Sequence, residues 1–299
     1  MKVSVITSAY NRADDLVRCI DSVLKSTYTD YEMIVIDNAS TDGTSEKLKA
    51  KYGDHIQLRT LSKNRFSSGG KNVGIKDSMG EYLWFVDSDM LVPETLMGDL
   101  TTILDGDPAI GLVGAQIYYY SDKDRVWSSG AKISLLTSMA KTVNSGAADL
   151  DLQEVPIILC GYMVRRDVVK EIGGFDEELK FVFEEASFAR KVYNLNYKII
   201  LAKRLKIYHN VELPEKITNP LRKYNLDDTD RAYFFARNRS FYMKRYAKWY
   251  GKVLYFVFWA HLFCAYYVCK AISLKRKDIA RAYFKGYVEG IKEYPYERK

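Results

Sequence analysis

Short apolar runs alternate with amphipathic stretches through the first half of the chain. Five apolar runs of strand length occur, at residues 3–10, 32–40, 56–62, 82–89 and 110–120. Between them, apolar residues recur at spacings of three and four, as at Leu16, Ile20 and Val23, which predicts helices. Strands that are apolar on both faces and alternate with helices predict an α/β fold: a Rossmann-like, mostly parallel sheet with helices on both faces.

Polar residues follow four of the predicted strands. They are Asn11 and Arg12 after the first strand, Asp37 and Asn38 after the second, Asn64 and Arg65 after the third, and Asp87 and Asp89 after the fourth. Because the carboxyl ends of parallel strands meet at one edge of a sheet, these endings predict a ligand site there. The alternative is ordinary turn chemistry, since Asn, Asp and Ser favour turns in any protein. We also expect Thr44 to be the N-cap of the helix after the second strand.

Two carboxylates, Asp87 and Asp89, end the fourth apolar run. Like charges this close repel, and burial would raise the pKa of both. Mg²⁺ or Mn²⁺ would relieve the repulsion, because these ions prefer oxygen ligands and share their coordination shell with a diphosphate. In a strand the two carboxylates would point the same way, with Ser88 opposite. We expect Asp89 to bind the metal and Asp87 to lie nearer a nucleotide ribose.

Six motifs give a more specific indication. In chain order they are "VSVITSAYN", "VIDNASTDGT", "NRFSSGGKNVG", "FVDSDM", "GGFDEEL" and "FEEASF". Their order resembles that of family 2 glycosyltransferases, the inverting enzymes of GT-A fold, and in particular the rhamnosyltransferase-like members that build polysaccharides and lipid-linked glycans. The resemblance covers roughly residues 2–210. It implies a nucleotide-diphosphate sugar donor of UDP, GDP or dTDP type, a divalent metal, and attack by an acceptor hydroxyl that inverts the anomeric carbon.

The resemblance implies roles for residues on the donor side. Ala9, Asn11 and Asp37 would line the nucleotide, with Asp37 on the uracil or ribose. Asn72 would lie beside the donor, after the glycines of the third motif. Asp87 would contact the ribose or the sugar.

It also implies a metal site and a base. Asp89 would bind the metal, and His209 matches a histidine that completes the metal site in some members. Glu184 and Glu185 occupy the family's Glu-Asp pair, whose second member is the general base. The sequence departs from the family at Glu185, which is usually Asp, and at Ser187, where an acid is often found. We expect Glu185 to be the base and Glu184 to be its rival, because a glutamate is also an ionised carboxylate near neutral pH.

Several of these residues would also suit a purely structural role. Glu184 and Glu185 would stabilise the N-terminus of the helix that follows them. His209 taken alone is typical of a strand end. Trp127 would stack on a sugar face or belong to the core. Asp176 would meet acceptor hydroxyls or lie in a solvated turn.

Charge and aromatic residues divide the chain in two. From residue 231 to the end there are 16 basic and 4 acidic residues, a net charge of +12, whereas the first 230 residues carry −5. The same 69 residues hold 20 of the 41 Phe, Trp and Tyr. We therefore expect a GT-A catalytic domain at 1–212 and a basic, aromatic, helical tail at 213–299 that associates with a membrane.

Within that tail, residues 253–269 form a run of 17 without formal charge apart from a neutral histidine. A spanning helix needs about 20 apolar residues, and Tyr, Trp and Phe are typical of membrane interfaces. The segment 253–274 is therefore expected to lie in the interface, with a single span or a soluble core or dimer helix as alternatives. Nucleic acid is not expected as a partner, because it does not explain the uncharged run.

The expected function combines these observations. The four cysteines show no zinc spacing, and the N-terminus reads as a strand, which indicates a reduced, cytosol-facing chain. We expect a metal-dependent glycosyltransferase of hexosyl or rhamnosyl type, using Mg²⁺ or Mn²⁺. It would act as a peripheral or monotopic protein at the anionic cytoplasmic face of the membrane, on a polyprenyl- or dolichyl-linked or surface glycan, and a homo-oligomer is compatible with this. The alternatives are a nucleotidyltransferase acting on a sugar phosphate and a catalytically silent membrane-bound GT-A module.

Overall fold

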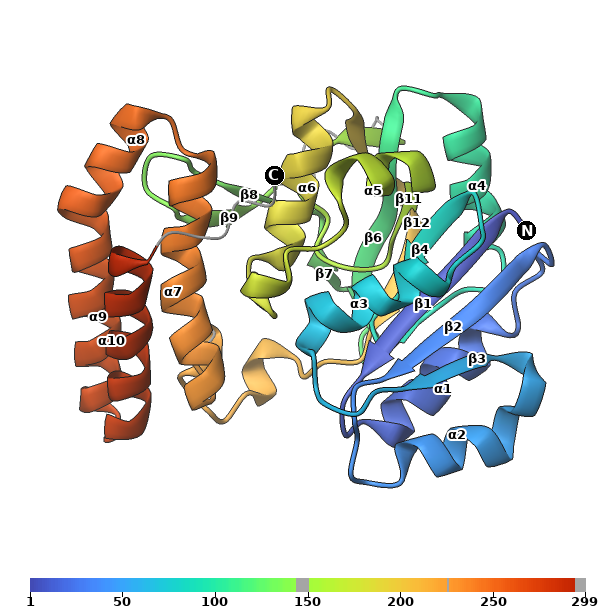
Figure 1. Ribbon diagram of the computed structural model, residues 1–299, viewed down its shortest axis with the longest axis horizontal. Coiled ribbons are helices and arrows are strands. Elements are labelled where there is room, and N and C mark those ends of the chain that lie inside the picture. The colour runs from blue at the N-terminus through green and yellow to red at the C-terminus, as the bar shows by residue number, and fades with distance from the viewer. Residues whose placement is uncertain (144–150, 225, 294–299) are drawn as a thin grey trace. The chain divides into compact units, whose positions relative to one another are not determined.

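The computed structural model describes residues 1–143, 151–224 and 226–293, and within it the chain forms two compact units (Figure 1). Unit 1 comprises Met1–Lys132, Thr142–Lys180 and Glu185–Glu212. Unit 2 comprises Ile133–Lys141, Phe181–Glu184 and Leu213–Lys299. The longest part of unit 2 therefore begins directly after Glu212, and two short segments from earlier in the chain join it.

Unit 1 is built on a mixed sheet. Its strands are β1 Val3–Ala9, β2 Tyr31–Asp37, β3 Gln57–Thr60, β4 Tyr82–Phe85, β5 Met90–Leu91, β6 Ile110–Tyr119, β7 Val126–Ser128, β10 Leu152–Glu154, β11 Tyr162–Arg165 and β12 Lys198–His209. The order across the sheet is β10-β12-β6-β11-β4-β1-β2-β3, with β5 beside β12 and β7 beside β6. A separate pair is formed by β8 Ala131–Ile133 and β9 Ala140–Thr142.

The first four strands predicted from the sequence pair in parallel. β1 pairs in parallel with β2 and β4, and β2 pairs in parallel with β3. β11 runs antiparallel between β4 and β6. The α/β fold expected from the sequence is confirmed, in a form where antiparallel strands complete the sheet.

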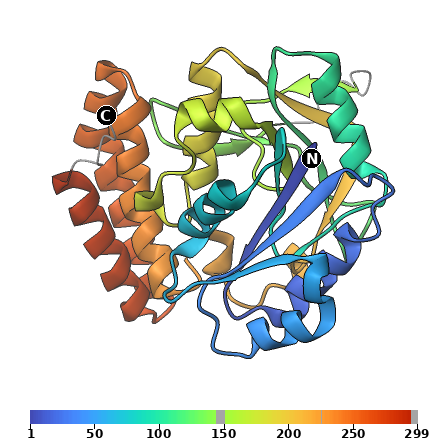
Figure 2. The same cartoon turned by 45° about the vertical axis from the view of Figure 1, so that its right-hand side comes forward.

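Helices cover both faces of this sheet. They are α1 Ala13–Val23, α2 Thr44–Tyr52, α3 Phe66–Asp77, α4 Leu96–Gly106, α5 Arg166–Ile172 and α6 Glu184–Asn194, with short 3₁₀ turns at Gly53–His55 and Glu177–Leu179. Side chains alternate along β1: Val3 and Val5 belong to the core that α1, α2 and α4 cover, whereas Ile6 lies against Gly74 of α3. α3 packs against β1 and β2, and Figures 1 and 2 both show it beside β1.

Two local predictions were wrong. α2 begins at Thr44, but its N-cap is Gly43, and the Asp42 carboxylate accepts the Thr44 N–H at 3.2 Å, so Asp42 takes the capping role expected of Thr44. β4 ends at Phe85, and Asp89 lies in a turn closed by a hydrogen bond from Met90 N to Asp87 O of 3.0 Å. This turn, rather than strand alternation, therefore sets the directions of the two carboxylates.

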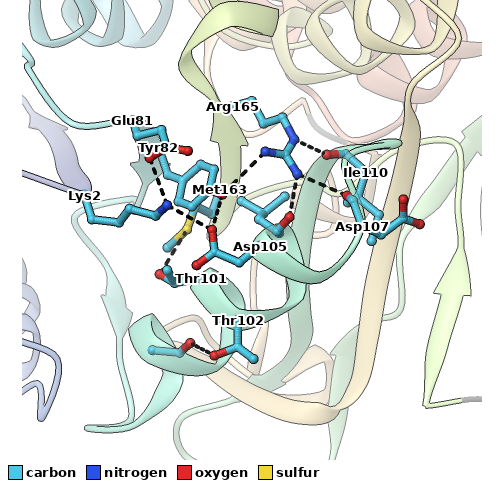
Figure 3. Close-up of polar contacts among 12 residues, drawn as sticks. Lys2, Glu81, Tyr82, Thr101, Thr102, Asp105, Asp107, Ile110, Met163 and Arg165 are labelled. Carbon is cyan, nitrogen blue, oxygen red and sulfur yellow. Dashed lines mark hydrogen bonds and ion pairs between the residues drawn. The ribbon is translucent and has the colours of Figure 1, made fainter.

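A polar network fixes the sheet at the edge opposite the strand endings (Figure 3). Lys2 Nζ lies 2.8 Å from Glu81 Oε2 and 2.9 Å from Asp105 Oδ1, which also accepts the Tyr82 hydroxyl at 2.6 Å. Arg165 Nε donates to the Ile110 carbonyl at 2.8 Å. The network joins the starts of β1, β4 and β6 to the end of β11, and so it ties parallel and antiparallel strands together.

Unit 2 is helical. Its helices are α7 Thr229–Tyr246, α8 Trp249–Leu254, a π-helical turn η5 Tyr255–Trp259, α9 Ala260–Ser273 and α10 Lys277–Lys292, preceded by 3₁₀ turns Pro214–Lys216 and Arg222–Tyr224. α10 packs along both α7 and α9, as Figure 1 shows. A Cβ at Gly286 would lie 2.1 Å from the Tyr233 carbonyl oxygen, so the close approach of α10 to α7 requires glycine there.

Candidate functional site

A buried lysine joins two carboxylates at the carboxyl edge of the sheet. Lys71 lies on α3, and its side chain is 5% exposed. Its Nζ lies 3.2 Å from Asp87 Oδ1 and also donates to Glu185 Oε1. The Tyr162 hydroxyl donates to the other oxygen, Glu185 Oε2. The sequence-predicted residues Asp87 and Glu185 thus meet at one cation.

The surroundings of Glu185 shift its acidity. Burial raises the pKa of Glu185 above its ordinary value of 4.5, and the negative charge of Asp87 acts in the same direction. The charge and hydrogen bond of Lys71 and the Tyr162 hydroxyl oppose this rise. Glu185 is therefore a carboxylate of increased proton affinity, held in a fixed orientation, which suits a general base.

Asp89 meets His209 a short distance along the same edge. Asp89 Oδ1 lies 3.2 Å from His209 Nε2, and Asp89 Oδ2 lies 3.3 Å from Arg12 Nη1. Burial would raise the pKa of Asp89, but the hydrogen bond and charge of His209 and the charge of Arg12 outweigh it, and the pKa is lowered. Asp89 is therefore ionised, and both sequence-predicted metal ligands lie side by side.

The residue types at this point fit a divalent cation that is also held by a ligand. His209 is buried, and its Nδ1 has no hydrogen-bond partner among the residues that the structure describes. Within residues 1–143, 151–224 and 226–293 no group of three or more His, Cys, Asp and Glu side chains is arranged to hold a metal ion. Asp89 and His209 would thus supply two ligands, and diphosphate oxygens and water would have to supply the others.

Asp37 and Asn11 organise the loops after β2 and β1. Asp37 is fully buried, accepts the Ser40 N–H at 2.9 Å, and accepts the Ser45 hydroxyl with its other oxygen. Asn11 has a positive φ of 52°, and its Oδ1 accepts the Thr41 N–H at 2.8 Å. Ala9 closes β1 in register with Asp37. The three residues expected at the nucleotide therefore lie on adjacent strand ends.

A glycine lets α3 approach this edge closely. A Cβ at Gly70 would lie 2.2 Å from Ser8 Oγ and 2.6 Å from Asn38 Nδ2. Asn38 in turn donates to Ser8 Oγ at 2.6 Å and to the Phe66 carbonyl at 3.1 Å. The "SSGG" segment is therefore needed to bring Lys71 to the two carboxylates.

Asn72 and Asp176 hold the loop that precedes α6. Asn72 Nδ2 donates to the Phe175 carbonyl at 2.9 Å, and Asn72 Oδ1 accepts the Phe175 N–H at 2.9 Å. Asp176 accepts Lys191 Nζ at 2.6 Å and Ser187 Oγ at 2.5 Å. These contacts attach the loop to α3 and to α6 itself, so both side chains fix the segment in front of Glu185.

Trp127 and Glu184 complete the predicted set. The Trp127 ring packs edge-on against the His209 ring, with centroids 4.5 Å apart, so it supports the imidazole beside Asp89. Glu184 begins α6 and is buried, but it belongs to the short segment assigned to unit 2. Glu185, not Glu184, is the residue that the structure joins to Asp87 through Lys71.

Sequence reasoning missed Lys71, Tyr162 and Arg12. A signal existed for Lys71, because a lysine that directly follows two glycines in "SSGGKNVG" interrupts a run of small residues. Tyr162 lies on an antiparallel strand whose pairing the local pattern does not reveal. Arg12 is part of a quoted strand ending, but its pairing with Asp89 depends on a contact across 77 positions.

Curated proteins similar to this chain are glycosyltransferases. The chain is 33% identical to glycosyltransferase GlyG of Streptococcus pneumoniae over 126 residues, which cover 41% of each chain. It is 41% identical over 103 residues to TarP of Staphylococcus aureus, a poly(ribitol-phosphate) β-N-acetylglucosaminyltransferase, covering 33% of this chain and 32% of TarP. The match thus spans less than half the length of each of these two relatives.

Solved structures similar to this chain share its fold. A crystal structure of GalNAc-T7 with UDP, GalNAc and Mn²⁺ matches with a TM-score of 0.60 and 17% identity, covering 80% of this chain and 51% of that one. A crystal structure of S. aureus TarS matches with a TM-score of 0.58 and 18% identity, covering 95% of this chain and 55% of that one. These likenesses confirm the GT-A type of α/β fold.

The family model described as "Glycosyl transferase family 2" matches residues 4–173, which include most of β1, all of α3 and the Asp87–Asp89 turn. This is more than half of the 299 residues. The chain therefore belongs to glycosyl transferase family 2.

Proposed function

We propose that this protein is a metal-dependent, inverting glycosyltransferase that moves a sugar from a nucleotide-diphosphate donor to a hydroxyl of a lipid-linked or surface glycan. The observation that carries the proposal is the sharing of Lys71 by Asp87 and Glu185. It brings a residue expected to contact the donor beside a residue expected to act on the acceptor. Transfer requires that arrangement, because donor and acceptor must react within bonding distance.

Glu185 is the base in this proposal. It accepts the proton of the acceptor hydroxyl while the hydroxyl oxygen bonds to the anomeric carbon, and the bond from that carbon to the diphosphate oxygen breaks. The nucleoside diphosphate leaves with the bonding electrons, and attack from the opposite face inverts the carbon. Glu185 then loses the proton to solvent. The raised pKa of Glu185 and its contacts with Lys71 and Tyr162 support its choice over Glu184.

Asp89 and His209 would hold Mg²⁺ or Mn²⁺ in this proposal. The cation would neutralise charge that develops on the departing diphosphate. The distance of 3.2 Å between the Asp89 and His209 side chains supports two neighbouring ligands. GalNAc-T7, which shares the fold, was solved with UDP and Mn²⁺.

Asp37, Ala9 and Asn11 would bind the nucleotide, with Asp37 on the base or ribose and Asn72 holding the loop beside the donor. Asp37 and Asn11 are fixed by backbone N–H groups from the loop after β2, so their orientation is set before a donor arrives. The donor would carry UDP, GDP or dTDP and a hexosyl or rhamnosyl group. Trp127 would support the His209 ring, and Asp176 would hold the first turn of α6 through Ser187.

The tail would bring the enzyme to its acceptor. The part of the chain that the structure describes contains one helix, Trp249–Ser273, that is long and apolar enough to cross a membrane, with a mean hydropathy of 1.4 and 17% of its apolar window buried. Its length and apolar character, and the net charge of +12 from residue 231 onward, support association with an anionic cytoplasmic leaflet. A polyprenyl- or dolichyl-linked glycan at that surface is the proposed acceptor. TarP, which acts on poly(ribitol-phosphate) according to its name, supports a polymeric acceptor as the other choice.

The experiment is a screen of nucleotide sugars for release of nucleoside diphosphate, with a membrane-lipid extract as acceptor. We expect one or a few donors to release nucleoside diphosphate only when both metal and extract are present. Release of pyrophosphate would instead indicate a nucleotidyltransferase. Absence of UDP binding with Mn²⁺ in isothermal titration, together with no release from any donor, would indicate a silent module.

A further inference from the structure

One face of the helix from Trp249 to Ser273 is both exposed and free of formal charge. Its most prominent side chains are Trp249, Val253, Val257, Phe258, Leu262 and Tyr266, and Val257 is 72% exposed. No exposed residue of this helix is Lys, Arg, Asp or Glu. A helix of a soluble protein normally has charged residues on its outer face, so this face is suited to contact with a surface other than water.

The π-helical turn keeps that face continuous. The inward positions are Gly251 before the turn, Tyr255 as its first residue, and Ala260, Cys264 and Ala271 after it. The step from Tyr255 to Ala260 is five residues, whereas the flanking steps are four. Five residues in an α-helix would turn the buried side away by about 140°, whereas one π turn takes up the extra residue and leaves about the same offset as the flanking four-residue steps. The outward residues therefore form a single stripe along the whole helix.

α7 and α10 pack on the inward side of the Trp249–Ser273 helix and carry cationic side chains. The Tyr267 and Tyr283 rings pack 5.0 Å apart, which joins α9 to α10. The Arg239 guanidinium of α7 lies 4.2 Å from the Phe263 ring centroid of α9. α10 exposes Arg281 and Lys285. If the helix crossed a bilayer in this packing, α7 and α10 would bring these cations into hydrocarbon, at high cost.

We propose that this uncharged face lies flat in the surface of a lipid bilayer, with its side chains at the boundary between headgroups and acyl chains and the rest of unit 2 outside. The composition fits that depth, because Trp and Tyr concentrate at membrane interfaces. Lys252 and Lys270 are half-buried, and they border the face rather than interrupt it, where they meet anionic headgroups. The proposal deepens the membrane association proposed above by naming the contact face, and it does not depend on transfer activity.

A second copy of the chain fits this face less well. A helix of this length is about 36 Å long and about 10–12 Å wide, so the outer half of its surface offers roughly 600 Å². Stable protein interfaces bury about 800 Å² on each partner. A bilayer has no such requirement, because each apolar side chain that enters it contributes separately.

The experiment is flotation of the full-length protein with vesicles of phosphatidylcholine and phosphatidylglycerol. We expect the wild type to float and to remain bound at about 1 M salt, where electrostatic attraction is screened within about 3 Å. The double variant Val257→Asp, Phe258→Asp should partition at least about tenfold more weakly. Met79→Asp, at a side chain of unit 1 that is 67% exposed, is the matched control and should float like the wild type. Equal UDP binding by all three proteins would show that they are folded.

Cys269 provides a second measurement on the same face. It is the exposed member of the four cysteines, all of which are free. An environment-sensitive dye on Cys269 should shift its emission to the blue when vesicles are added, and alkaline carbonate should then release the protein from them. No shift, or flotation by the double variant at the wild-type level, would overturn the proposal. Resistance to carbonate would establish a spanning helix instead. If the wild type does not bind vesicles but forms a dimer, and the double variant is monomeric, a second copy of the chain is the occupant of the face.

Discussion

Lys71 and Glu185, which are 114 positions apart in the sequence, form a hydrogen-bonded ion pair at the carboxyl edge of the sheet. The pair places a positive charge against the proposed base. It also explains how Glu185, whose side chain is only 12% exposed, can lie beside Asp87 and still ionise, because Lys71 contacts both carboxylates. Lys71 is therefore a positioning residue for the proposed reaction.

The first prediction concerns Lys71→Met. Transfer requires ionised Glu185, so the rate rises with pH through the pKa of Glu185. That pKa lies above the ordinary 4.5 in the wild type, and loss of the lysine charge raises it further. We expect the acidic limb of the kcat/KM profile to move to higher pH by about one unit or more, with roughly tenfold less activity below the new limb.

Lys71→Arg is the control for that prediction. Because arginine keeps the positive charge, the acidic limb of its kcat/KM profile should move much less than that of Lys71→Met. A profile in Lys71→Met that falls at all pH values without moving its acidic limb would contradict the electrostatic role. It would leave Lys71 as a packing residue of α3.

The second prediction concerns the base itself. Glu185→Gln should lower transfer by about 10²–10⁴-fold, since the amide cannot accept the proton, while the affinity for the nucleotide sugar stays close to that of the wild type. Initial rates and calorimetric titration measure the two quantities. Glu171→Gln, at an exposed glutamate of α5, should change neither. Wild-type transfer by Glu185→Gln, or a greater loss in Glu184→Gln, would move the base elsewhere.

The third prediction concerns metal. Removal of divalent ions with a chelator should abolish transfer, and Mn²⁺ or Mg²⁺ should restore it. Asp89→Ala should prevent restoration at any metal concentration. His209→Ala should raise the metal concentration needed for half-maximal activity, because one of two protein ligands is lost. Full activity of the chelated wild-type enzyme would contradict the assignment of Asp89 and His209.

The fourth prediction concerns stability at the edge of the sheet far from the site. Arg165 donates to the Ile110 carbonyl at 2.8 Å and to the Asp107 carbonyl at 3.1 Å. Arg165→Met removes both hydrogen bonds of this charged donor and should lower the free energy of unfolding by about 2–3 kcal/mol, with transfer per folded molecule unchanged. Lys198→Met removes an exposed ion pair with Asp107 and should cost at most about 1 kcal/mol. Urea unfolding distinguishes the two, and equal losses would contradict the importance of the network.

The local pattern of the sequence predicted those strands and helices that depend on residues close together in the chain. β1, β2, β4 and β6 are apolar runs, and the polar residues predicted to follow β1, β2, β3 and β4 do lie at the ends of four adjacent strands. The antiparallel place of β11 could not be predicted, because it depends on which distant strands pair on either side of it. For the same reason the partnership of Tyr162 with Glu185 was not foreseen.

The candidate site was likewise predicted only in part. Asp87, Asp89 and Glu185 were named from motifs, whereas the cations that hold them, Lys71 and Arg12, were found only in the structure. A motif states which residue types recur at a spacing. It does not state which charge compensates them when the chain is folded.

The anomeric configuration of the transferred sugar is the most direct test of the central claim. It can be read by proton NMR of the product made with the donor that the screen identifies. If Glu185 activates an acceptor hydroxyl for direct attack, the sugar in the product has the configuration opposite to that in the donor. A product with the donor's configuration would contradict the account, because it would require a second displacement in which Glu185 is not the base described here.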